Sequence, residues 1–515
     1  MATAVPAPDH PLQPEVVDKG LQHDSVGLLA AIAMSVSSVA PAYALTATLG
    51  LTVTEVGLQT PAIFLVGFVP MLLVAYAYRD LNRAVPDAGT SFTWTVKAFG
   101  PHVGWMCGWG MVIAIVIVLS NLAGIAVTFL YLFVSEVVGN PDIATWGDTK
   151  SVNVATCLAY IAVATYVAWR GMTTTKSVTY LLVAIQMVAL ALFVGFALVK
   201  ATNGEVSTAI DFQWSWLSPL SIESFSVLAT ALSLSIFMYW GWDTCLSCNE
   251  ETTGSEHTPG LAAVLSLLIL GTTYVLVAVA AEMYAGIGNE GVGLGNPDTT
   301  DNVFAALADP VMGGTLGLLL FLAVLASSAS SLQTTFVPGA RTMLAMSVYK
   351  ALPERLSRVH PKNRVPSYAT VLAGVGTAIF YSAMTLVSED VLVDTILSLG
   401  LMICFYYGLT AFAAAWYFRR DSLSSARQFL LKGVAPVLGG ATLAAVFLKL
   451  AIDAQDPAYG SGGSIFGLGT VFVLGVGALL LGVVVMLAWQ ARQPAFFRGE
   501  TLKKDTPVLV VVDEP

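Results

Sequence analysis

Twelve predominantly apolar stretches divide this chain, and each is long enough to cross the hydrocarbon core of a bilayer, which takes roughly 20 helical residues. Only 11% of the 515 residues are charged, whereas soluble domains carry roughly 25%. The sequence therefore predicts an all-α integral membrane protein with twelve transmembrane helices. The stretches are 27–50, 56–78, 103–134, 152–168, 178–199, 224–248, 261–285, 312–345, 367–387, 391–417, 434–452 and 466–489.

Positive charge falls almost entirely on one set of loops. Arg79, Arg83 and Lys97 follow the second stretch, six Lys or Arg residues lie between positions 341 and 364, and four more lie between 492 and 504. Cytoplasmic loops of membrane proteins are enriched in Lys and Arg. We therefore predict a multi-pass protein of the cell (cytoplasmic) membrane with both termini inside, ending in cytoplasmic tails over 1–24 and 491–515.

Two of the twelve stretches are interrupted at mid-depth. The first contains SVSSVAPAYAL (35–45), three serines and a proline where an unpaired backbone group is costly. The sixth contains FMYWGWDTCLSCNEE (237–251). These stretches open two halves, 25–200 and 224–417, which we predict to be inverted five-helix repeats followed by two more helices over 433–490. Transporters built this way turn their interrupted helices toward the substrate.

The second interruption places a carboxylate, Asp243, close to mid-membrane, where an ionisable group is by default a functional hypothesis. It can hold a substrate ammonium or carry a proton, or serve only as a fixed partner for freed backbone amides. The aromatic rings beside it can offer cation–π faces to an amine, or simply pack. The predicted substrate-binding residues are Ser35, Ser37, Ser38, Ala40, Pro41, Asn121, Phe237, Tyr239, Trp240, Gly241, Trp242 and Asp243.

Other polar residues are candidates for ion coupling and gating. The hydroxyls of Ser327, Ser328, Ser330 and Ser331, with Gln333 nearby, can coordinate Na⁺ together with carbonyls of the first helix, or let helices pack closely. Tyr406 and Tyr407 are predicted at an outer gate. Glu250 and Glu251 follow the second interruption on the cytoplasmic side, where an ion pair with Arg341 would form an inner gate.

Four segments in order resemble the amino acid, polyamine and organocation (APC) superfamily of permeases. Residues 79–109 resemble its P-x-AGG-x-Y and GW signature, 239–262 its F-x-GFD…EE…P, 327–369 its SR-x-x-x-AMARDG-x-LP, and 398–416 its tenth helix. The resemblance covers roughly residues 25 to 490. It implies a leucine-transporter-like 5+5 inverted repeat plus two C-terminal helices, with helices 1 and 6 unwound around a central site and Phe237 as a gating aromatic.

Two positions depart from the family pattern. Amino-acid-selective members carry glycines at the helix 1 interruption, but this chain has none between Gly27 and Gly50, which weakens the case for a bound α-carboxylate and favours an amine. Alignment on Gly171 places Gln186 where proton-coupled relatives often carry a coupling lysine. The coupling therefore stays open between a proton, a sodium ion bound near helices 1 and 8, and uncoupled or exchange transport.

The sequence predicts a secondary active transporter of a small amino acid or related amine or polyamine, proton-coupled in the leading interpretation. No catalytic dyad and no phosphate-binding GxxxxGK[ST] loop occurs, so we predict neither an enzyme nor a nucleotide-driven pump. Beyond the sodium ion we expect no cofactor, no metal and no nucleic acid partner, only the substrate and the bilayer. The alternatives are a sodium-coupled or exchange transporter of amines, an inorganic-cation carrier and a nutrient sensor with a transporter fold.

Overall fold

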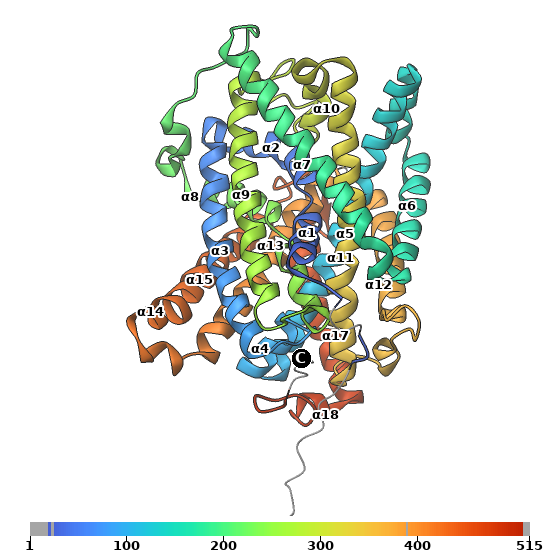
Figure 1. Ribbon diagram of the computed structural model, residues 1–515, viewed down its shortest axis with the longest axis vertical. Helices are drawn as coiled ribbons and strands as arrows, with labels where there is room; N and C mark the ends of the chain where they lie inside the picture. The colour runs from blue at the N-terminus through green and yellow to red at the C-terminus, as the bar shows by residue number, and fades with distance from the viewer. Residues whose placement is uncertain (1–18, 22–24, 388–389, 508–515) are drawn as a thin grey trace, which may run out of the picture.

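The computed structural model describes residues 19–21, 25–387 and 390–507, so the predicted tails lie largely outside the described residues. It is a bundle of long helices that run along one axis (Figure 1). The helices are α1 (Leu28–Val39), α2 (Pro41–Val56), α3 (Thr60–Ala84), α4 (Ser91–Phe99), α5 (Pro101–Val138), α6 (Lys150–Arg170), α7 (Met172–Thr202), α8 (Phe225–Met238), α9 (Thr258–Ala285), α10 (Val303–Leu307), α11 (Gly314–Val348), α12 (Ser367–Val387), α13 (Val391–Tyr417), α14 (Ala426–Gln428), α15 (Ala435–Asp453), α16 (Thr470–Phe472), α17 (Ala478–Arg492) and α18 (Pro494–Phe497).

Short strands and non-α helical segments lie between these helices. A short antiparallel pair, β1 (Ser464–Ile465) and β2 (Leu468–Gly469), lies in the connection between α15 and α16. A 3₁₀ segment, η5 (Trp242–Glu251), continues the direction of the sixth apolar stretch after α8. The described residues contain eleven apolar segments of membrane-spanning length, and the first, Leu28–Ala84, has 57 residues. Because about 20 residues make one crossing, that segment crosses twice and the prediction of twelve crossings is confirmed.

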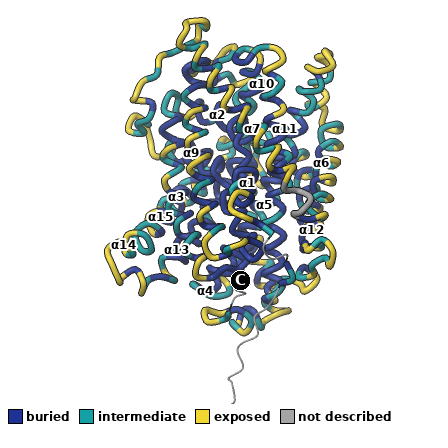
Figure 2. Tube along the Cα trace, viewed as in Figure 1, coloured by how far each residue is buried: buried dark blue, intermediate teal, exposed yellow. Residues whose placement is uncertain are grey.

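Burial divides the bundle into an inner and an outer set of helices (Figure 2). In α13, 83% of the most apolar window is buried, whereas the corresponding share is 17% in α6. The outer helices instead expose large aliphatic side chains, such as Val163, Leu181, Ile379 and Val484. An apolar surface of this extent is stable only against lipid, so α5, α8 and α13 form the core and α6, α7, α12 and α17 face the bilayer.

Helix α8 packs closely against α3 and α13 because small residues on both neighbours let it approach. A Cβ atom added at Gly67 of α3 would lie 2.1 Å from the Ser235 hydroxyl, and one at Gly400 of α13 would lie 2.0 Å from the Ser233 hydroxyl. Both serines belong to α8. Small residues at helix contacts are typical of membrane bundles, and here they hold the first half of the interrupted sixth stretch against α3 and α13.

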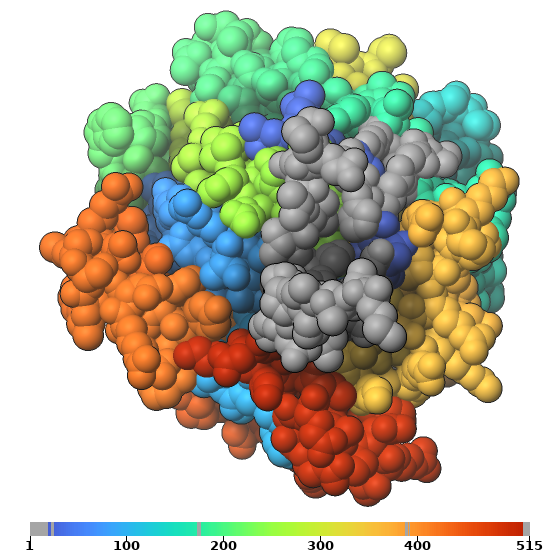
Figure 3. All heavy atoms as spheres, turned by 60° about the horizontal axis from the view of Figure 1, so that its bottom comes forward, coloured from blue at the N-terminus to red at the C-terminus, as the bar shows by residue number. Residues whose placement is uncertain are grey.

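Both described chain ends lie at one end of the bundle, which we call the terminal face (Figure 1). The buried helix α4 lies across this end, in the predicted polar segment between the second and third stretches. The ammonium of Lys97 in α4 donates to the carbonyl oxygens of Lys504 and Thr506, and Figure 3 shows the red C-terminal residues beside the light blue chain around α4. The opposite end of the bundle carries α10, and we call it the opposite face.

Candidate functional site

The first interruption is a single residue between two helices. α1 ends at Val39, Ala40 takes left-handed dihedrals (φ 56°, ψ 66°), and α2 starts at Pro41, whose ring cannot supply an amide donor. Side chains of α11 bind two of the backbone groups that the interruption frees. Ser331 Oγ donates to the Ser38 carbonyl at 2.7 Å, and the Tyr43 amide donates to Ser327 Oγ at 3.2 Å.

The second interruption lies against the first. α8 ends at Met238, Gly241 has φ 103°, and the chain continues as η5. A Cβ atom at Gly241 would lie 2.9 Å from Ser38 Oγ and 3.1 Å from the Ser38 carbonyl carbon, so glycine is required there for two reasons. Thr244 Oγ1 also donates to Ser38 Oγ at 2.7 Å. Ser38 therefore joins both interruptions and α11 at one point.

Asp243 lies two residues beyond this contact and is 4% exposed. Its Oδ1 accepts a hydrogen bond from the Tyr407 hydroxyl of α13 at 2.7 Å. Its Oδ2 is buried and has no hydrogen-bond partner among the described residues. Leaving one oxygen of a buried carboxylate unpaired is costly, and a proton or a cation at this oxygen removes that cost.

Aromatic rings surround Asp243. The Tyr407 ring lies 4.5 Å from Tyr406, 5.3 Å from Trp242 and 5.5 Å from Tyr78, measured between ring centroids, and Trp242 and Tyr78 are 5.0 Å apart. The Trp240 indole N–H donates to the Tyr406 hydroxyl. Rings with a carboxylate among them form an environment that an ammonium group can enter, because the ring faces and the carboxylate both attract positive charge.

Several predicted residues lie near this cluster without touching Asp243. Phe237 packs edge-on against Tyr43 with centroids 6.1 Å apart. Ser37 Oγ lies 3.3 Å from Thr334 Oγ1, so the first interruption meets α11 through a second hydroxyl pair. Ser35 is buried in α1. Ser328 is buried without a hydrogen-bond partner among the described residues, and Ser330 donates to the Ser327 carbonyl of its own helix.

Four other predicted residues have their side-chain contacts elsewhere in the bundle. The Tyr239 hydroxyl donates to the Phe64 carbonyl of α3 at 3.0 Å. Asn121 Oδ1 accepts a hydrogen bond from the Thr395 hydroxyl, and Asn121 lines a hollow of about 200 Å³ near the opposite face. Gln186 is fully buried in α7 with both amide atoms unpaired among the described residues. Gln333 lines another hollow, of about 50 Å³, between α1, α7 and α11.

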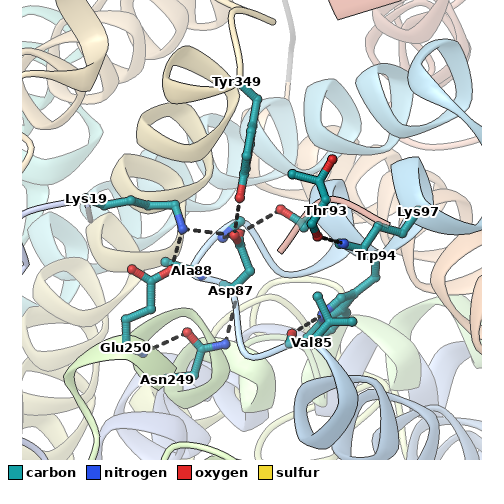
Figure 4. A network of polar contacts seen from close by, with 12 residues as sticks. Lys19, Val85, Asp87, Ala88, Thr93, Trp94, Lys97, Asn249, Glu250 and Tyr349 are labelled. Atoms are coloured by element: carbon teal, nitrogen blue, oxygen red, sulfur yellow. Dashed lines mark hydrogen bonds and ion pairs between the residues drawn. The ribbon is translucent and has the colours of Figure 1, made fainter. Parts of the chain in front are cut away.

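The two acidic residues at the end of η5 each meet a buried cation. Arg341 Nε donates to Glu251 Oε2 at 2.6 Å, as the predicted inner-gate pair requires. Glu250 instead binds Lys19, whose Nζ lies 2.5 Å from Glu250 Oε1. Asp87, in the connection between α3 and α4, is the second acceptor of Lys19, at 2.9 Å (Figure 4). These contacts occupy the terminal face, below the hollow that Gln333 lines.

Sequence reasoning missed Thr244, Tyr78, Lys19 and Asp87. Nothing in the sequence distinguishes Thr244 and Tyr78 as site residues, because a threonine or tyrosine in an apolar stretch is most often a packing residue. Lys19 and Asp87 were visible as charges, but only the tertiary structure brings them together across 68 positions.

A protein-family model described as amino acid permease matches residues 26–474. The branched-chain amino acid permease BcaP of Bacillus subtilis is 24% identical over 75% of this chain and 79% of its own length. The low-affinity putrescine importer PlaP of Escherichia coli is 22% identical over 76% of this chain and 81% of its own.

An arginine/ornithine antiporter of Latilactobacillus sakei is 23% identical over 80% of this chain and 83% of its own length. The crystal structure of MhsT with L-phenylalanine superposes with a TM-score of 0.57 at 15% identity, over 83% of this chain and 99% of that one. This likeness confirms the leucine-transporter-like fold.

Proposed function

The chain belongs to the amino acid permease family, and from this premise we propose that it carries a small amino acid, amine or polyamine across the cytoplasmic membrane by secondary transport. Its relatives include an amino acid permease, a putrescine importer and an arginine/ornithine antiporter, whose named substrates all bear an ammonium group. The family consists of membrane transporters and not enzymes.

One observation carries the choice of substrate class: Asp243 Oδ2 is buried, unpaired among the described residues and surrounded by aromatic rings. The ammonium of the substrate binds at this oxygen, and the faces of Trp242 and Tyr407 add cation–π attraction. Ser38, Gly241 and Thr244, which meet where the two interruptions contact each other, supply polar groups close to Asp243 in the chain. A backbone without glycine at residue 40 offers few free amides to a carboxylate, which favours recognition through the amine.

Transport follows from movement about the two interruptions. α1, α3, η5 and α9 pack on one another, while α5, α11 and α13 form a second unit. A hollow of about 370 Å³ near the opposite face lies between α2, α8 and α13, and the hollow that Gln333 lines lies on the terminal half. Rocking of the first unit on the second opens one hollow to Asp243 at a time, which is alternating access.

The same carboxylate explains coupling. An unpaired buried carboxylate must be neutralised when the substrate leaves, and a proton is the smallest group that can do so. Sodium is the alternative, bound by the Ser38 carbonyl with Ser327 and Ser331, because these oxygens already converge at the first interruption. The terminal face carries the predicted cationic loops, so we infer that it is cytoplasmic.

Counterflow tests the proposal. Proteoliposomes loaded with unlabelled putrescine, leucine or arginine are diluted into a trace of the same labelled compound, and a carrier concentrates the label transiently. We expect counterflow with at least one amine-bearing compound and none with the matching deaminated acids or alcohols. Counterflow with a deaminated analogue at an equal rate would contradict recognition through the ammonium.

A further inference from the structure

A groove of about 380 Å³ runs between α6 and α12 on the outer side of the bundle, where these helices lie side by side (Figure 1). Ile161 and Gly374 are buried at its base, whereas Tyr166 and Val375 on its walls are 56% and 51% exposed. A Cβ atom at Gly374 would lie 2.2 Å from Thr165 Oγ1, so the two helices are in contact at the base of the groove. The groove is therefore shallow, apolar and open to the bilayer.

The groove has the length of one leaflet. Its lining on α6 runs over the eleven positions from Leu158 to Trp169, which is about 16 Å along a helix. α6 ends at Arg170 on the terminal face, so the groove begins at that face and ends near mid-membrane. Half of a hydrocarbon core about 30 Å thick is about 15 Å. One extended acyl chain from the terminal-face leaflet therefore matches the groove in length.

Aromatic rings mark the terminal-face end of the groove. The rings of Tyr166 and Trp169 stack with centroids 6.2 Å apart, and the Trp169 ring lies 5.2 Å from that of His360. Tyr368, in the first turn of α12, is 52% exposed. Tyrosine and tryptophan side chains are enriched at the level of the lipid headgroups. This end of the groove therefore lies at the depth of a lipid phosphate.

Positive charge gathers at the same end. Arg170 is exposed, its Nη1 donates to the Tyr166 hydroxyl at 3.1 Å, and its Cζ lies 5.9 Å from the centroid of the Tyr166 ring. The guanidinium is therefore held beside the wall of the groove. Asn363 Nδ2 donates to the Trp169 carbonyl at 3.0 Å, which joins the loop 358–364 to the end of α6.

The loop 358–364 adds three exposed cations, Arg358, Lys362 and Arg364. The backbone amides of Lys362 and Asn363 donate to His360 Nδ1 at 3.3 and 3.2 Å, so the turn that carries Lys362 is fixed beside the His360 ring. No Asp or Glu occurs in the sequence over 149–202 or 357–387, which includes α6, α12 and this loop. The terminal-face end of the groove is thus complementary in charge to an anion.

We propose that this groove binds one anionic phospholipid of the terminal-face leaflet, with an acyl chain between α6 and α12 and the phosphate at Arg170 and Lys362. A guanidinium can donate two parallel N–H bonds to phosphate oxygens. Basic pockets between transmembrane helices on the cytoplasmic side bind anionic headgroups. None of the residues that line the groove is among those that contact Asp243, so lipid binding and transport can be tested separately.

Photolabelling locates the lipid. The purified full chain in a neutral detergent is mixed with phosphatidylglycerol that carries a diazirine midway along one acyl chain, and mass spectrometry maps the adducts after illumination. We expect adducts within 158–169 and 371–378. Unlabelled phosphatidylglycerol should compete about tenfold better than phosphatidylcholine with the same chains, because the choline ammonium meets the same cations. Glycerol 3-phosphate, which has no acyl chain, should not compete.

Three variants separate the contributions of charge and shape. Arg170→Gln combined with Lys362→Gln should lower the affinity for phosphatidylglycerol about 25-fold, since each Lys or Arg near anionic headgroups contributes about fivefold. Arg427→Gln is the matched control: it removes an exposed cation in α14, across the bundle from α6 and α12 (Figure 1), and should leave the affinity within about twofold. Ala162→Phe keeps every charge but fills the groove, so it should lower labelling by both lipids.

Four results would overturn the site. The first is adducts that map outside the groove, or equal competition by the two lipids. The second is an equal loss of affinity in Arg427→Gln, because attraction to the whole face would then explain the preference. The third is competition by glycerol 3-phosphate as strong as by phosphatidylglycerol, which would assign the cations to a soluble phosphate ester. The fourth is a dimer whose groove stays unlabelled, which would assign the groove to a second copy of the chain.

Discussion

Replacement of Asp243 by asparagine is the most informative single change, because it alters charge and almost no volume. The asparagine Oδ1 still accepts the 2.7 Å hydrogen bond from Tyr407, so the fold around η5 should persist. The change removes the negative charge that the account assigns to the ammonium of the substrate. Loss of one partner from a buried ion pair costs about 3 kcal/mol or more, which is about a 100-fold loss of affinity.

The substrate concentration that gives half-maximal counterflow measures this loss of affinity. Two further variants serve as comparisons. Tyr407→Phe keeps the charge but removes one hydrogen bond to it, so the half-saturating concentration should rise only about tenfold. Glu282→Gln neutralises another fully buried carboxylate, near the end of α9, and should leave half-saturation unchanged. If folded Asp243→Asn transports with the half-saturation and ion dependence of the wild type, the role of Asp243 is refuted.

Three other predictions follow from single positions. Gly241→Ala should abolish transport and lower the apparent Tm, because its φ of 103° and the Ser38 contact both exclude a Cβ, whereas Gly195→Ala, which meets nothing within 4 Å in α7, should leave both unchanged. Gln186→Lys should change the ion dependence of uptake, and an unchanged dependence would count against the alignment that placed it. The Tm of wild type should exceed that of Lys19→Met by an amount that grows as the pH rises above about 4. Without the Lys19 charge, burial raises the pKa of the Asp87 and Glu250 carboxyls, so the variant loses stability above the usual carboxyl pKa of about 4, whereas in wild type Lys19 holds the pKa of Asp87 below that value. A Tm difference that stays constant between about pH 4 and about pH 8 would contradict these charge states.

The architecture was predictable because it depends on patterns that are local in the sequence. Apolar length sets the crossings, and Pro41 with Gly241 marks the places where a helix cannot continue. The choice of Asp243 was also local, since one carboxylate in an apolar stretch is conspicuous. The sequence does not show which hydroxyls and rings contact Asp243. Tyr407, whose hydroxyl bonds to it, lies 164 positions away along the chain.

The terminal face was the least predictable region. The Arg341–Glu251 pair was expected from the need to neutralise buried charge, and the structure confirms the contact. Glu250, its neighbour, turns to Lys19 instead, a residue that hydropathy assigns to a polar tail. Tyr239 shows the same limit: it lies in the interruption, but its hydroxyl donates to the Phe64 carbonyl, a partner 175 positions away that the local sequence does not indicate.

Gradient-driven uptake tests the central claim most directly. Proteoliposomes that contain the full chain receive labelled amino acids and amines while a proton or a sodium gradient is imposed separately. The account predicts that an ammonium-bearing compound accumulates above its external concentration under the proton gradient, and that Asp243→Asn abolishes this accumulation. Accumulation under the sodium gradient alone would mean that a sodium ion bound by the oxygens around Ser38 drives transport, and not a proton on Asp243. Equilibration of inorganic cations without accumulation of any amine would contradict the proposed function.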